Sequence, residues 1–164
     1  MKYLRTNFIR SSIFLLLITL SFQACKSDKK SNEVAMTTTQ DEAIFDAYLQ
    51  LSDALIKSDA ELAQKHANAI VEAYEYDEND IVLLAVTISE VEDLEEQRNL
   101  FYQLSQRMEG FINSKLEVGS VYKQYCPMAF DDTGAYWFST SKEILNPYFG
   151  DAMLHCGTIE KTIE

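Results

Sequence analysis

The chain has 164 residues, of which 47% are apolar and 12% aromatic, so it can bury a core and is not a disordered chain. A chain of this length has room for one domain and an export signal. The formal net charge is −12, and this acidic excess argues against a nucleic acid as the partner.

The first 24 residues have the layout of a secretory signal. Lys2, Arg5 and Arg10 precede an apolar stretch, residues 13–22, which is too short to span a bilayer. Removal of residues 1–24 takes away these three positive charges and no acid, which leaves a net charge of −15. We therefore expect an exported protein.

The end of this signal resembles a bacterial lipobox. Residues 20–25 read Leu-Ser-Phe-Gln-Ala-Cys, with Phe22 at a position where leucine is usual. This pattern predicts acylation of Cys25, with an uncleaved or conventionally cleaved signal as the alternative. Three acyl chains would anchor the protein stably to a membrane of the bacterial cell envelope, facing the periplasm. Residues 25–40 are polar and predict a flexible tether.

Helical periodicity extends from Asp41 to Leu116. Apolar residues recur there at steps of three and four, which is typical of amphipathic helices. A capping box at Ser58 predicts the start of a second helix, and residues 77–80 predict a turn before a third. We place a further break at residues 89–93, where an aspartate can cap the next helix. The segment predicts an antiparallel bundle of three to four helices.

The composition changes after Leu116. Both prolines, four of the five glycines and the only tryptophan lie in the segment that follows. Residues 121–125 and 135–138 are compatible with a short β-hairpin or with an irregular aromatic wrap, and residues 141–144 with one helical turn. We expect a mainly α fold in which residues 118–164 form a compact, mostly irregular cap on the bundle, within one domain of residues 41–164.

The cap contains the soft ligands of the protein. Cys126 and Met128 are two residues apart, and Met153 and Cys156 are three residues apart. Alternate residues of an extended segment share a face, and residues three apart share a face of a helical turn. Four sulfur atoms can therefore converge, and thiolate and thioether ligands select Cu(I) over magnesium, calcium or manganese. His155 is a weaker, accessory candidate ligand.

A disulfide between Cys126 and Cys156 is the alternative. Paired cysteines in an exported protein often form a disulfide, and methionine also fills gaps in a core. Closing a loop of this length would stabilise the fold by about 3.5 kcal/mol in the chain-entropy model. The residue chemistry leaves both possibilities open.

The order of motifs in the cap is similar to that of the uncharacterised DUF3347 family. The runs that carry the resemblance are Tyr125 to Ala129, Gly134 to Ser139, Glu143 with Ile144, Asn146 to Gly150, Met153 with Leu154, and Cys156 with Gly157. The resemblance implies a small bacterial envelope domain, found alone on lipoproteins or fused to periplasmic adaptors of heavy-metal efflux pumps, and suspected of binding copper. It carries over Cys126, Met128, Met153 and Cys156 as candidate ligands, whereas His155 lies at a position expected to vary.

No pattern in the sequence indicates an enzyme. There is no nucleophile-elbow glycine pattern, no histidine pair of a zinc protease and no phosphate-binding glycine loop. We therefore expect an envelope lipoprotein that binds Cu(I) and buffers it or passes it to an efflux adaptor or another envelope protein. The alternative is a protein-interaction domain stapled by a disulfide and without a metal.

Overall fold

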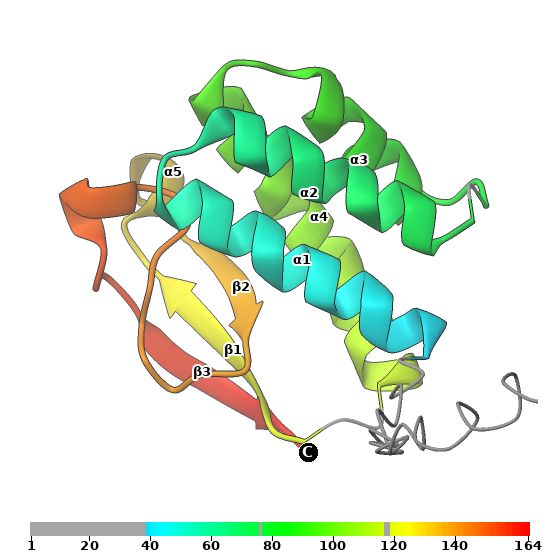
Figure 1. Cartoon of the computed structure of the whole chain (residues 1–164). Helices are drawn as coiled ribbons and strands as arrows, with labels where there is room; N and C mark the ends of the chain where they lie inside the picture. Colours follow the sequence, from blue (N-terminus) through cyan, green and yellow to red (C-terminus); the bar gives the residue numbers. More distant parts are fainter. Residues whose placement is uncertain (1–38, 76, 117–118) are drawn as a thin grey trace, which may run out of the picture. The chain divides into compact units, whose positions relative to one another are not determined.

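A computed structural model describes residues 39–75, 77–116 and 119–164. Four helices come first in the chain, and a small sheet follows them (Figure 1). The helices are α1 (Gln40–Ile56), α2 (Ala60–Ala73), α3 (Asp80–Glu90) and α4 (Leu94–Lys115). The cap consists of β1 (Val121–Cys126), α5 (Ala129–Asp132), β2 (Ala135–Ser139), the 3₁₀ helix η1 (Gly150–Met153) and β3 (Thr158–Ile163). The predicted mainly α fold is confirmed.

Most helix starts follow from local capping chemistry. The Asn79 side chain accepts hydrogen bonds from the amides of Ile81 and Val82 at the start of α3. The predicted break between α3 and α4 is confirmed, because the Asp93 carboxylate accepts from the Glu96 amide at 2.8 Å. Such caps satisfy amides that have no partner within the helix.

The predicted capping box at Ser58 is wrong. Asp59 is the cap of α2, and its carboxylate accepts from the Leu62 amide at 2.9 Å. Ser58 has a left-handed backbone with φ 55°, and its Oγ accepts a hydrogen bond from Arg98 on α4 at 3.0 Å. The Ser58 hydroxyl, which the local pattern assigned to the start of the second helix, therefore binds a residue 40 positions later in the chain.

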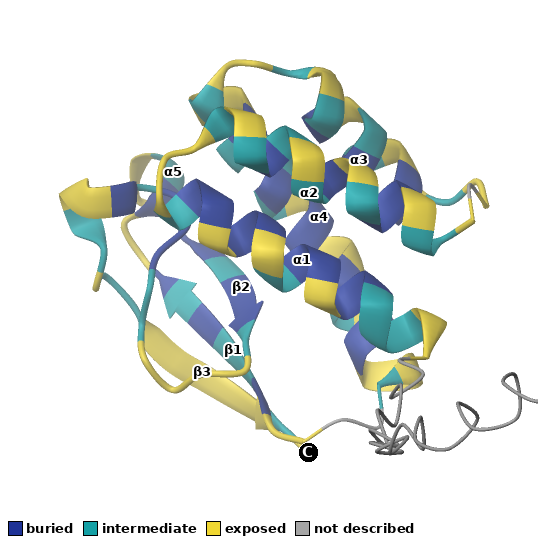
Figure 2. Cartoon of the chain, in the orientation of Figure 1, coloured by how far each residue is buried: buried dark blue, intermediate teal, exposed yellow. Residues whose placement is uncertain are grey.

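The cap contains a three-stranded antiparallel sheet in the order β2-β1-β3. β1 and β2 pair with Cys126 opposite Ala135, so the hairpin is the correct one of the two alternatives that the sequence left open. The third strand was not predicted. β3 lies at the edge of the sheet and is exposed along almost all of its length (Figure 2). The predicted helical turn at residues 141–144 is also wrong, because the Ser141 Oγ accepts from the Glu143 amide in a bend.

A continuous core joins the bundle and the sheet. The largest fully buried side chains come from all four helices and from β2. Among the described residues no helix is both long enough and apolar enough to cross a bilayer. The signal, Cys25 and almost all of the expected tether lie outside the described residues. The bundle and the cap are therefore the parts in which a site can be located.

The Tyr48 hydroxyl makes the buried polar link between bundle and sheet. It lies 2.7 Å from the Ser105 Oγ on α4 and accepts a hydrogen bond from the Phe138 amide on β2 at 3.2 Å. Burial raises the pKa of the Tyr48 hydroxyl, so the group stays neutral. One oxygen on α1 thus connects a helix and a strand that are distant in sequence.

We expect Tyr48→Phe to lower the free energy of unfolding by about 1–3 kcal/mol, because it leaves a buried amide and a buried hydroxyl without their partner. Urea denaturation of the purified protein measures the change. Tyr122→Phe is the matched control, since the Tyr122 hydroxyl has no hydrogen bond to another described residue and its loss should change stability by less than about 0.5 kcal/mol. Equal stability of the two variants would contradict the link.

Candidate functional site

The two cysteines of the cap lie side by side. Cys126 is the last residue of β1, and Cys156 follows η1 in a turn in which its amide donates to the Met153 carbonyl at 3.0 Å. Their Sγ atoms are 2.7 Å apart, although 30 residues separate them in the chain. Cys126 is fully buried, Cys156 is half-buried, and both are free thiols. The predicted convergence of the thiols is present in the structure.

Asn146 holds the segment that carries Cys156. Its side-chain amide donates to the Cys156 carbonyl at 3.1 Å, and its backbone amide donates to the Leu154 carbonyl at 2.8 Å. Its side-chain oxygen accepts from the Tyr148 amide at 2.9 Å. Asn146 is fully buried, so these bonds are protected from water. The sequence analysis named Asn146 only in a run that carries the family resemblance and did not predict these hydrogen bonds.

Gly157 permits the close approach of the strand behind Cys156. A Cβ at this position would lie 3.0 Å from the Tyr125 carbonyl oxygen and 3.0 Å from the edge of the Trp137 ring. Both neighbours belong to the sheet, and one of them is backbone, so neither can move easily. The glycine therefore allows Cys156 to lie against the end of β1.

The proximity of the two sulfurs affects the protonation of Cys156. A hydrogen bond with Cys126, followed in importance by burial, raises the pKa of the Cys156 thiol to about 11. The Met128 backbone amide opposes this shift by a hydrogen bond to the same sulfur. Cys156 is consequently a thiol at neutral pH, and a metal must displace its proton in order to bind.

The remaining candidate ligands are less well placed. The Met128 side chain is 50% exposed, next to the amide that faces Cys156. Met153 is half-buried at the end of η1 and contacts Cys156 through its carbonyl. His155 is exposed, with Nδ1 2.9 Å from the Ile144 carbonyl, which leaves Nε2 as its available ligand atom. No cluster of three or more His, Cys, Asp or Glu side chains suited to a metal occurs in the described part of the chain.

A left-handed turn follows the Cys126-Pro127-Met128 segment. Phe130, Asp131 and Asp132 have φ values of 52°, 54° and 62°. Left-handed backbone costs roughly 1–2 kcal/mol for each non-glycine residue, so three in succession must be held by their surroundings. The Phe130 ring provides part of this support, because it stacks on Tyr102 of α4 with 5.4 Å between ring centroids. No pattern in the sequence analysis predicted this left-handed conformation.

A comparison with protein families gives one match. Residues 44–117 match the model of a family described as a protein of unknown function, DUF3347. This match supports the resemblance to the DUF3347 family that the motifs of the cap indicated. The matched residues extend from α1 to the end of α4 and exclude the cap, so the ligands that the resemblance implied stay predictions. No curated protein and no solved structure matches the chain significantly.

The raised pKa of Cys156 can be tested by alkylation. Below its pKa a thiol gains about tenfold in thiolate per pH unit, and a cysteine with an ordinary pKa of about 8.5 levels off near pH 9.5. We expect the alkylation rate of Cys156 by iodoacetamide in the reduced protein to keep rising beyond pH 10. Mass spectrometry of the peptide that contains Cys156 measures this rate.

The matched variant is Cys126→Ala, which removes the hydrogen bond that contributes most to the shift. Its Cys156 should reach a constant alkylation rate at lower pH than the wild type. If both proteins level off at the same pH, Cys126 does not control the protonation of Cys156.

Proposed function

We propose that the protein binds one Cu(I) ion through the thiolates of Cys126 and Cys156. The observation that supports this most directly is that two free thiols, one of them half-buried, lie side by side in the cap. Cu(I) prefers soft ligands and low coordination numbers, and the sheet and Asn146 hold this pair together. An ion between the two sulfurs needs more room than their 2.7 Å separation gives, so the thiolates must move apart on binding. The bound ion is cargo, which the protein buffers or passes to an efflux adaptor or another envelope protein.

Met128 is the best placed further ligand. Its backbone amide bonds to the Cys156 sulfur, and its exposed side chain has three rotatable bonds that allow the thioether to turn toward the sulfurs. Met153 and His155 are secondary candidates. Met153 contacts Cys156 through its backbone carbonyl and not through its sulfur, and the His155 Nδ1 faces the Ile144 carbonyl. Since both thiols must lose protons on binding, the apparent affinity for the metal should rise with pH.

A specific observation also favours the alternative, a disulfide-stapled interaction domain. The two sulfur atoms need to approach from 2.7 Å to about 2.05 Å to form a bond. In that reaction the two thiols lose two protons and two electrons to an oxidant, for example the disulfide of a thiol oxidoreductase. The product has no thiolate, so the oxidised protein cannot bind copper through these residues.

Competition for copper distinguishes the two functions. We expect the purified protein, reduced under nitrogen, to withdraw about one equivalent of Cu(I) from a colorimetric chelator. Cys126→Ser or Cys156→Ser should weaken binding by about 100-fold or more, and Met128→Leu by roughly tenfold, because a thiolate is a stronger ligand than a thioether. Met153→Leu and His155→Ala should have smaller effects.

Met108→Leu is the control for the methionine variants, since Met108 is fully buried in α4 and the swap nearly conserves volume. It should leave copper binding unchanged. If the reduced wild type withdraws no copper at micromolar protein, the interaction domain is the better account. If the disulfide forms, Cys126 and Cys156 should carry no free thiol after purification in air. Cys126→Ser should then have a lower melting temperature than the wild type in oxidising buffer.

We further propose that Cys25 is acylated and anchors the protein in the cell envelope. The proposal rests on three features of the sequence: basic residues at the N-terminus, a short apolar stretch after them, and a small residue directly before this cysteine. Cys25→Ala should move the protein from the membrane fraction to the soluble fraction on cell fractionation, whereas Cys126→Ala should leave it in the membrane. A Cys25→Ala protein that stays with the membrane would contradict the anchor.

A further inference from the structure

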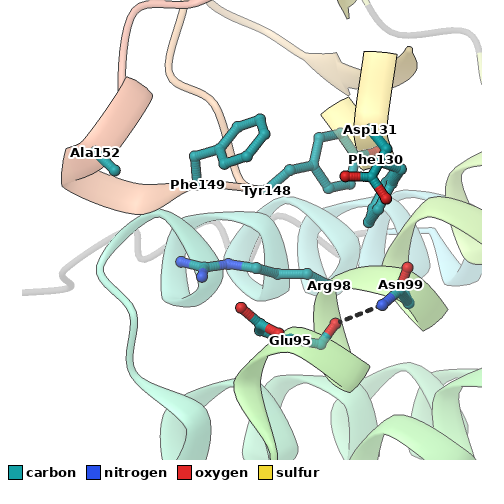
Figure 3. A pocket seen from close by; sticks show the side chains of 8 residues that line it. All are labelled: Glu95, Arg98, Asn99, Phe130, Asp131, Tyr148, Phe149 and Ala152. Carbon is teal, nitrogen blue, oxygen red and sulfur yellow. Dashed lines mark hydrogen bonds between the residues drawn. The ribbon is translucent and has the colours of Figure 1, made fainter. Parts of the chain in front are cut away.

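A cavity separate from the cysteine pair lies between α4 and the cap. Its volume is about 410 Å³, which is within the range of pockets that bind small molecules or single side chains. Glu95, Arg98 and Asn99 of α4 line one side (Figure 3). Phe130, Asp131 and the segment 148–152 lie opposite them.

Aromatic rings form the apolar part of this cavity. Phe130, Tyr148 and Phe149 line it, and the Phe130 and Tyr148 rings meet edge to face with 5.2 Å between centroids. The faces of such rings carry negative electrostatic potential and attract cations. Tyr148 is buried, and its hydroxyl donates to the Tyr136 carbonyl at 2.6 Å, which fixes the ring in place.

Arg98 does not make the cavity a site for anions. Its Nε donates to the Pro147 carbonyl at 3.1 Å, and its Nη2 donates to the Leu55 carbonyl at 3.2 Å and to Ser58. The guanidinium therefore directs most of its hydrogen-bonding capacity at the protein itself. Its role is to join α4 to the end of α1 and to the cap.

The carboxylates of the cavity are exposed and form no direct ion pair. Neither Glu95 nor Asp131 lies within 4.0 Å of a cationic side chain of the described residues, although Glu95 is near enough to Arg98 to favour the charged form of its guanidinium. Asp132 and Asp151 are neighbours in sequence of lining residues and are also exposed. The left-handed turn places Phe130 and Asp131 in succession at this mouth. An aromatic wall and exposed carboxylates thus occur together, on a strongly acidic protein.

We propose that this cavity binds an organic cation, an alkylammonium or guanidinium group, between the aromatic rings of Phe130 and Tyr148 and the carboxylates of Glu95 and Asp131. Aromatic faces and carboxylates together recognise such cations, because the rings replace water around the apolar stem while the acids balance the charge. The cation is either a free amine or the side chain of a lysine or arginine in a partner. This site uses none of the cysteines and is independent of the copper proposal.

NMR titration of the ¹⁵N-labelled whole protein tests the site. The probes are Nα-acetyl-arginine amide and Nα-acetyl-lysine amide, with Nα-acetyl-citrulline amide as the neutral isostere of arginine. We expect the two cations to shift the amide signals of residues 95–99, 130–131 and 148–152 with millimolar affinity, and more weakly at high salt, whereas citrulline should have no effect. The arginine-containing pentapeptide acetyl-Gly-Gly-Arg-Gly-Gly-amide and methylguanidine then distinguish the source: a peptide that binds more tightly indicates a polypeptide partner, and equal binding indicates a small molecule.

Glu95→Gln and Asp131→Asn should each weaken binding by about two- to fivefold, the effect of one partly exposed ion pair. Asparagine tolerates the left-handed backbone of position 131, so this variant should keep the turn. Asp46→Asn is the matched control, because Asp46 is exposed on α1 and does not line the cavity. Equal shifts with citrulline and arginine, or variants that bind as tightly as Asp46→Asn, would overturn the proposal.

Discussion

The hydroxyl of Tyr48 connects parts of the fold that are far apart in sequence. It bonds to Ser105 on α4 and accepts from the Phe138 amide on β2, in a place that water does not reach. Because β2 is an edge strand, the Phe138 amide has no neighbouring strand to bond to, and leaving it buried without a partner would destabilise the fold. We therefore infer that β2 lies on the bundle where this oxygen meets it. The position of β2 fixes β1, and β1 carries Cys126. The geometry of the cysteine pair therefore depends on a helix residue that is nowhere near a sulfur atom.

Arg98 supports the other end of the cap in a similar way. Its three hydrogen-bond acceptors are on Leu55, Ser58 and Pro147, so a single side chain joins the end of α1, the start of the next loop and the segment before η1. The loop from Cys126 to Cys156 is thus held at its two ends by the contact between the cysteines and at Pro147, within the loop, by Arg98. The cavity walls at Phe130 and Tyr148 are parts of this same loop.

The helices were predictable because their signals are local. Asp93 caps the fourth helix with residues next to it in sequence, and the apolar periodicity identified the buried faces. Ser58 was mispredicted because a guanidinium 40 residues away decides how its hydroxyl is used. β3 was missed because strand pairing is non-local, although four of its six residues are β-branched, which is a usable signal for a strand. Residue type sufficed to find the cysteine pair, whereas the left-handed turn at Phe130 depends on tertiary packing against Tyr102, which no local pattern records.

The short distance in sequence between Cys156 and β3 has a consequence for the last strand. Only Gly157 separates them, and β3 contributes little buried surface of its own, with one bulge in its pairing to β1. An edge strand of this kind gains most of its stability from being kept close to its partner. Any link between Cys126 and Cys156, covalent or through a shared ligand, maintains a high effective concentration of β3 beside β1. The protection of the backbone amides of β3 from hydrogen exchange should therefore differ between the linked and the unlinked state of the two sulfur atoms.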